Sequence, residues 1–335
     1  MRERRADIEA AKGLAIVLVV FGHLVARQDP AGVHWYEPLR RAVYAFHMPL
    51  FLYLSGLVAV YSGFLQRPRR AFLGLALRRA QRLLVPFFGL GVLIVLGKCA
   101  AAGLVHVDNA PAGVWAGLRA LVWDTGHSPA LSIWYLFVLF VVSLGSVLVL
   151  DGQVARLPWL LVVSLVVFWV PLPGYVYLDR VGMFAPFFLL GAAAGFAGAR
   201  WEGVVDRVWP WAMAVFCACL AAIVFCGAET AFTQRASLLL VGVISFPAIH
   251  GLLRCSWFIP HQKAFLLLGR YGFMIYLFNT LFIGLVKGGL LLVWSWDGAH
   301  FLPFACVLMC AGLMGPVALK RYAFRRVKFL DRMTG

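Results

Sequence analysis

Three residues near the amino end, Glu9, Lys12 and His23, have side chains that could do chemistry together. On an α-helix, Lys12 and His23 would differ by only ~20° around the axis, and Glu9 and His23 by ~40°. The three would then share one stripe, with Lys12 and His23 separated by ~16 Å along the axis. Histidine can act as a general base near neutral pH, whereas Glu9 is better placed to pair with Lys12, three residues on. The competing interpretation of His23 is an interfacial histidine at a helix end.

A second histidine and a basic cluster follow. His47 begins the next apolar stretch, at a depth not far from His23, so the two imidazoles could meet; a lone interfacial histidine is the alternative. Arg79 and Arg82 lie one helical turn apart, beside Arg78. Guanidinium groups match the geometry of phosphate oxygens and keep their charge when partly dehydrated. The pair is therefore a candidate phosphate site, or else a cytoplasmic membrane anchor.

These residues belong to a chain that is too apolar for a soluble fold. Of its 335 residues, 63% are hydrophobic and 13% charged, whereas soluble domains are about half apolar and about a quarter charged. The net charge is +16, but the basic residues stand in short runs between apolar segments, as in membrane proteins. We therefore expect a lipid bilayer as partner and no nucleic acid. The seven cysteines lack metal-ligand spacing, so we expect no metal and no disulfide framework.

The elements that must position the reactive residues are transmembrane helices. The predicted fold is an all-α polytopic bundle of about ten spans, forming a single domain over residues 1–335 with no separate soluble domain. More than two-thirds of the 30 lysines and arginines fall on the side of the amino terminus, which predicts that both termini are cytoplasmic. Residues 114–123 could form a re-entrant or surface helix. The spans are expected at about 8–26, 44–63, 83–104, 133–150, 157–171, 182–198, 209–226, 235–253, 266–287 and 300–320.

Five motifs occur in order between residues 5 and 279. They are Arg5 to Gly13 with Gly22-His23, Phe46 to Phe51 with Leu54-Ser55-Gly56, Arg79 to Pro86, Ile133 to Leu136, and Gly269 to Leu277. Each motif is short, but the set in register resembles the acyltransferase-3 family of membrane acyltransferases.

The resemblance implies a ten-helix bundle in a bacterial cytoplasmic membrane. It also implies transfer of an acyl group, often acetyl from acetyl-CoA, to a hydroxyl of an envelope carbohydrate or lipid-linked glycan. In the family, the histidine that matches His23 is the leading catalytic candidate. The positions that match Lys12, Arg79 and Arg82 are tied to activity or donor binding.

The sequence departs from the family pattern at three points. The family often has aspartate where Glu9 stands and arginine where Lys12 stands, and lysine loses bidentate recognition of phosphate. A histidine often follows the fifth motif, where this chain has Phe278-Asn279. No acid–base role is therefore carried to that position.

The sequence thus predicts a site in which acyl-CoA is held at the cytoplasmic mouth and its thioester reaches His23. His23 would take the proton of the acceptor hydroxyl, although a relay through an acyl-histidine is equally open. The acceptor sugar, the acyl length, the side of the membrane and the oligomeric state are left open. The predicted residues are His23, Lys12 and Glu9 for catalysis, Arg78, Arg79 and Arg82 for the donor, and His47 and Tyr135 for substrate binding.

Two other classes of protein compete with the enzyme. A transporter or flippase of about ten helices would also carry charged groups within its spans and use helices broken by proline or glycine. An obvious two-fold sequence repeat, which would favour a transporter, is lacking. A scaffold subunit would not need the stripe of Glu9, Lys12 and His23.

Overall fold

The computed structural model describes residues 5–25, 30–103, 107, 109–226, 230–327 and 330–331. Apart from one bridge between Ala31 and Asp297, the regular structure of these residues is helical. Helices suit a bilayer because each satisfies its own backbone hydrogen bonds, which lipid cannot do.

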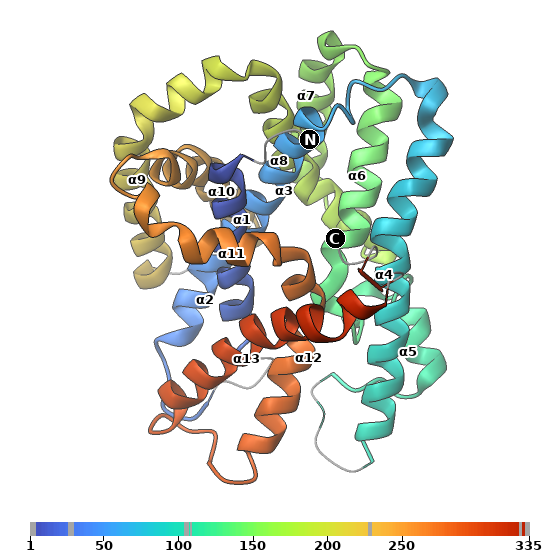
Figure 1. The fold of residues 1–335 in the computed structure, drawn as a ribbon, viewed down its shortest axis with the longest axis vertical. Helices are drawn as coiled ribbons and strands as arrows, with labels where there is room; N and C mark the ends of the chain where they lie inside the picture. The colour runs from blue at the N-terminus through green and yellow to red at the C-terminus, as the bar shows by residue number, and fades with distance from the viewer. Residues whose placement is uncertain are drawn as a thin grey trace. The chain divides into compact units, whose positions relative to one another are not determined.

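The chain divides into two compact units, and α3 (His47–Tyr61) passes from one to the other. Unit 1 combines residues 1–54 with 198–335, and unit 2 comprises residues 55–197. The other helices of unit 1 are α1 (Ala6–Gly22), α2 (Tyr36–Tyr44), α9 (Ala199–Cys226), α10 (Ala231–Arg254), α11 (Lys263–Arg270), α12 (Gly272–Leu290) and α13 (Phe301–Tyr322), labelled in Figure 1. Those of unit 2 are α4 (Phe72–Ala101), α5 (Val114–Ala120), α6 (Trp134–Leu150), α7 (Leu157–Trp169) and α8 (Leu178–Ala197). Short 3-10 helices cover Arg69–Ala71, Thr125–His127, Leu131–Ile133, Val154–Arg156, Tyr175–Tyr177, Ile259–His261 and Phe324–Arg326.

Among the described residues, eight helical segments are long and apolar enough to cross a membrane. They match eight of the expected spans and identify the chain as a multi-pass membrane protein. The two remaining spans, 8–26 and 157–171, correspond to α1 with 17 residues and α7 with 13, which fall short of the ~20 that a perpendicular span needs. The count of ten stays a prediction. The eight segments are Tyr36–Tyr61, Arg69–Ala101, Leu131–Leu150, Tyr175–Ala197, Ala199–Cys226, Ala231–Arg254, Gly272–Leu290 and Phe301–Arg326.

The second expected span differs from the structure at its start. A separate amphipathic helix, α2, ends at Tyr44, and after a turn α3 begins at His47. Pro49 lies in the first turn of α3, where a missing backbone N–H breaks no helical hydrogen bond. The apolar pattern does not show this break, so the span expected from residue 44 includes the last residue of α2.

The ninth expected span is divided. Tyr271 separates α11 from α12, and α11 packs across α1 in unit 1 (Figure 1). The crossing is close: a Cβ at Gly13 would lie 1.9 Å from the carbonyl oxygen of Phe265, and one at Gly269 would lie 2.0 Å from that of Glu9. Only glycine fits at these two positions, so the glycines of the first and fifth motifs set the contact between α1 and α11.

Within unit 2, α6 packs against α4 and α8. The segment that joins the two units also depends on glycine, because a Cβ at Gly56 of α3 would lie 2.0 Å from the carbonyl oxygen of Phe188 on α8. α5 is the short helix expected between residues 114 and 123, and it is only seven residues long.

Candidate functional site

Helix α1 carries Glu9 and Lys12 of the predicted stripe, and His23 directly follows it. The helix runs unbroken from Ala6 to Gly22, and His23 is the residue that ends it. Lys12 Nζ donates to Glu9 Oε1 at 2.9 Å, as the i, i+3 spacing predicts. His23 is half-buried at the opposite end of the helix. The structure therefore pairs Glu9 with Lys12 and leaves His23 to partners from other helices.

Helix α2 closes the end of α1 at His23. Three side chains of one face of α2, spaced four residues apart, donate to backbone carbonyls there. Tyr36 Oη donates to Phe21 at 2.6 Å, Tyr44 Oη to Gly22 at 2.8 Å, and Arg40 Nη1 to Val25 at 3.1 Å. The last carbonyls of a helix lack partners within it, and these bonds add donors at the end of α1 and hold the backbone on both sides of His23.

His47 is brought to the same place. Its side chain is 6% exposed, and its ring lies 4.9 Å from the ring of Tyr44 between centroids. His47 Nδ1 contacts the Val43 carbonyl at 2.8 Å, and because a carbonyl only accepts, Nδ1 carries the hydrogen. In a neutral ring Nε2 then keeps its lone pair. His47 and His23 are close enough to interact electrostatically, and Arg40 interacts with His23 in the same way.

The predicted donor residues lie in unit 2, on α4. Arg79 Nε donates to Ser143 Oγ at 3.1 Å, and the guanidinium lies 4.6 Å from the centroid of the Phe64 ring. Arg82 and Arg78 have exposed side chains on the same helix. An arginine that is stacked and hydrogen-bonded through Nε presents its terminal nitrogens in a fixed direction.

Tyr135 lies near these arginines. Its hydroxyl is hydrogen-bonded to Ser55 Oγ at 2.5 Å, and both Arg79 and Arg82 are within its electrostatic reach. Glu9, Lys12, His23 and His47 are thus in unit 1, and Arg78, Arg79, Arg82 and Tyr135 are in unit 2. The structure brings His23 together with His47 and Arg79 together with Tyr135, and the route between the two groups stays a prediction.

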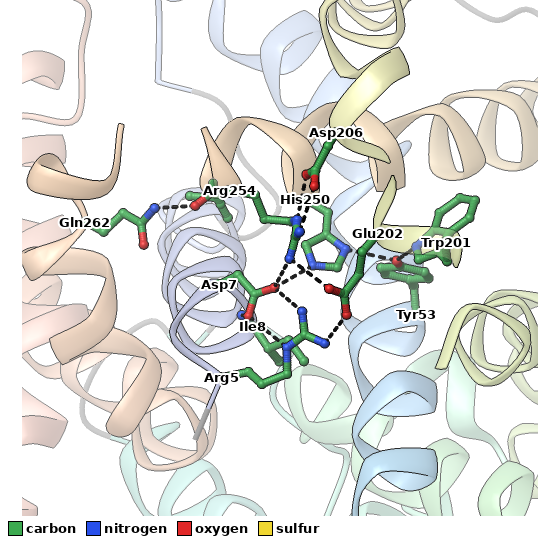
Figure 2. A network of polar contacts seen from close by, with 11 residues as sticks. Arg5, Asp7, Ile8, Tyr53, Trp201, Glu202, Asp206, His250, Arg254 and Gln262 are labelled. Atoms are coloured by element: carbon green, nitrogen blue, oxygen red, sulfur yellow. Dashed lines mark hydrogen bonds and ion pairs between the residues drawn. The ribbon is translucent and has the colours of Figure 1, made fainter. Parts of the chain in front are cut away.

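Besides the His23–His47 group and the Arg79–Tyr135 group, unit 1 contains a polar cluster that the sequence analysis does not predict (Figure 2). Asp7, in the first turn of α1, pairs with Arg5 Nη2 at 2.8 Å, His250 Nε2 at 3.1 Å and Arg254 Nη1 at 3.4 Å. His250 Nδ1 meets Tyr53 Oη at 3.1 Å, and Trp201 Nε1 donates to that same hydroxyl at 2.7 Å. Acidic residues of α9 complete the cluster. Glu202 pairs with Arg5 and Arg254, and Asp206 accepts two bonds from Arg254.

The sequence held a partial signal for this cluster. Arg5 and Asp7 stand in the first motif, and His250 is a histidine within an otherwise apolar span, the kind of residue that is costly in a membrane and tends to have a function. Their pairing could not be read from spacing, because Asp7 and His250 are 243 residues apart. A small cavity of about 240 Å³ adjoins the cluster between Asp7 and Arg254.

Comparison with known proteins places the chain in a family. The sequence profile of an acyltransferase domain matches residues 5–321. The nodulation protein NolL of Sinorhizobium fredii (strain NBRC 101917 / NGR234) is 36% identical over 121 residues, which are 36% of this chain and 31% of that relative. NolL of Mesorhizobium japonicum (strain LMG 29417 / CECT 9101 / MAFF 303099) is 36% identical over 85 residues, which are 25% of this chain and 22% of the relative.

The chain therefore spans less than a third of the length of each of these curated relatives. No solved structure matches it. The profile match nevertheless extends over nearly the whole chain, from the first motif to the end of α13. The chain belongs to the acyltransferase-3 family.

Proposed function

We propose that this chain moves an acetyl group from cytoplasmic acetyl-CoA to a hydroxyl of an envelope carbohydrate or lipid-linked glycan in a bacterial cytoplasmic membrane. Both termini would face the cytoplasm, in keeping with the distribution of lysine and arginine. The observation that carries the proposal is the pair of histidines, His23 and His47, held at one end of α1 by the hydrogen bonds of α2.

In the proposed reaction His23 is the general base. It takes the proton of the acceptor hydroxyl while the oxygen attacks the thioester carbonyl carbon. The carbon–sulfur bond then breaks, the ester forms, and the imidazolium returns the proton to the thiolate of CoA. His47, with its Nε2 lone pair directed away from Val43, would accept a hydrogen bond from the acceptor.

The donor would be held by its phosphates. Arg79 is fixed by Ser143 and Phe64, and Arg82 and Arg78 add positive charge on the same helix. Charge-assisted hydrogen bonds from guanidinium to phosphate are about twice as strong as neutral ones. Tyr135 would contact the substrate beside Arg79. Lys12, neutralised in part by Glu9, would contribute at the amino end of α1.

The test is label transfer in isolated membranes. Membranes that contain the protein, the His23→Ala variant or neither are incubated with acetyl-CoA labelled in the acetyl group, and ester-bound label in the glycan fraction is counted. We expect label to accumulate with the wild-type protein and to fall by about 100-fold or more with His23→Ala, the usual contribution of a general base. Normal transfer by His23→Ala at an equal protein level would contradict the assignment of the base.

A further inference from the structure

His250 joins two helices that carry the proposed reactive histidines. Its Nε2 bonds Asp7 of α1, and its Nδ1 bonds Tyr53 of α3. α1 ends at Gly22, directly before His23, and α3 begins at His47. Among the described residues α1 and α3 have little direct backbone contact. Besides α2, which joins α3 through a short turn, a second link between them runs through α10, which carries His250 (Figure 2).

The directions of these hydrogen bonds are fixed by chemistry. The carboxylate of Asp7, paired with two arginines, only accepts, so the hydrogen of a neutral His250 ring sits on Nε2. Nδ1 then accepts from the hydroxyl of Tyr53, whose oxygen accepts from the indole N–H of Trp201. One chain of bonds runs from Trp201 through Tyr53 and His250 to Asp7, and every polar atom in it is satisfied in the manner that a buried group requires.

Burial excludes His250 and Tyr53 from contact with a substrate. His250 is 1% exposed, and Tyr53 is 0% exposed with its ring stacked on Phe246 at 4.2 Å between centroids and 10° between planes. An Asp–His–Tyr chain could otherwise suggest an activated nucleophile. With the hydroxyl buried and the imidazole almost completely buried, what the chain of bonds can do is hold helices.

We propose that His250 is a positioning residue that fixes α1 against α3 and so sets the placement of His23 relative to His47. This inference rests on the proposed function, in which these two imidazoles act together. Near His23, α1 is held by α2; near its other end, it is held through Asp7. A helix fixed at both ends cannot slide or rotate, and misplacement of a reacting group by about 1 Å can lower turnover about 100-fold.

Two conservative variants test the two hydrogen bonds of His250 separately, the bond to Asp7 and the bond to Tyr53. The amide nitrogen of His250→Gln lies three bonds from Cβ, as Nε2 does, and can still donate to Asp7. The amide oxygen of His250→Asn lies two bonds from Cβ, as Nδ1 does, and can still accept from Tyr53. Only histidine reaches both at once. Tyr53→Phe removes the same link from the other side and keeps the ring that stacks on Phe246.

Turnover and donor binding are measured separately, by label transfer at a series of acetyl-CoA concentrations. We expect each of the three variants to lose about 10- to 100-fold in kcat, with KM for acetyl-CoA unchanged within about twofold. The matched control is His261→Gln, which alters an exposed histidine of the same unit and should transfer at the wild-type rate. Wild-type turnover by either His250→Gln or His250→Asn would overturn the proposal, because one hydrogen bond would then suffice.

Hydrogen exchange provides a readout that does not depend on activity. We expect the amides at residues 19–25 to exchange faster in the three variants than in the wild type, and to be unaffected in His261→Gln. If the wild-type protein transfers no label, the proposed function fails. Faster exchange in the variants would still show that His250 fixes α1 against α3. If the variants lose yield and thermal stability but keep wild-type kcat per folded molecule, His250 is a stability residue and the proposal is wrong.

Discussion

Arg79 is the side chain on which binding of the donor would depend most. Its Nε is committed to Ser143, one face of its guanidinium lies over Phe64, and Tyr135 is within reach. Lysine has the same charge but cannot form this planar, two-sided arrangement. Charge alone is therefore not the property that the position requires.

Replacement of Arg79 by lysine should weaken the binding of acetyl-CoA without unfolding the protein. We expect Arg79→Lys to raise the concentration of acetyl-CoA needed for half-maximal thermal protection by about tenfold, the loss of one charge-assisted hydrogen bond of ~1.5 kcal/mol. Arg70→Lys, an exposed arginine of the same unit, is the control and should behave as the wild type. Equal protection in the two variants would mean that Arg79 does not bind the donor.

At this scale the sequence predicted contacts within one helix and missed contacts between helices. The Glu9–Lys12 pair follows from a spacing of three residues, whereas the span expected at 8–26 placed His23 inside a helix that in the structure ends at Gly22. The bonds of His250 to Asp7 and Tyr53 depend on the packing of α10 against α1 and α3. The spacing of apolar and polar residues along the sequence does not show which helices pack together.

Among the elements, α2 is the one that turns a helix end into a defined site. Its three donors, Tyr36, Arg40 and Tyr44, bind the carbonyls around His23. Tyr44 also accounts for the glycine of the first motif, because a Cβ at Gly22 would lie 2.4 Å from a ring carbon of Tyr44. The small residue before His23 lets α2 approach.

Removal of the Tyr44 hydroxyl should affect the reaction more than the fold. Tyr44→Phe keeps the ring beside His47 and leaves the Gly22 carbonyl without its donor, at a cost of about 1 kcal/mol. We expect a small fall in the melting temperature and a larger, roughly tenfold fall in label transfer, because the backbone at His23 is freed. Tyr322→Phe, which alters an exposed tyrosine of α13, serves as the comparison; a matching effect there would remove α2 from the mechanism.

The crossing of α1 and α11 makes a prediction about stability. Gly13→Ala would force a methyl group against the backbone of Phe265, which cannot move aside as a side chain could. Overpacking of this kind typically costs about 1–3 kcal/mol, so the melting temperature should fall. Gly284→Ala, in α12 where a Cβ would meet no atom within 4 Å, should leave it unchanged or slightly raise it. Equal melting temperatures would show that α1 and α11 do not cross so closely.

Apolar runs predicted the long helices, but two features of the elements escaped them. α2 contains Glu37, Arg40 and Arg41 and is not apolar enough to register as a span. The break at Tyr271 lies inside the span expected at 266–287, beside Arg270, where α11 packs tightly on α1.

For the molecule as a whole, the family and the membrane assignment rest on independent observations. Eight long apolar helical segments in the described residues fit a multi-pass membrane protein, and the profile match over residues 5–321 fits an acyltransferase. Acyl-CoA is made in the cytoplasm, whereas many envelope glycans are modified outside it. A protein that spans the bilayer can bring the two substrates together. This is why α1, with Lys12 in its first half and His23 directly after its last residue, is central to the proposal.

The most direct test is mass spectrometry of the envelope glycans of cells that express the wild-type protein, the His23→Ala variant at an equal level, or neither. The proposed function predicts glycan species heavier by one acetyl group in the first cells only, and fragmentation would place that group on a hydroxyl. Identical glycan spectra in cells with the wild-type protein and cells without it would contradict transfer to an envelope glycan, and acetylation that persists with His23→Ala would contradict the role of His23.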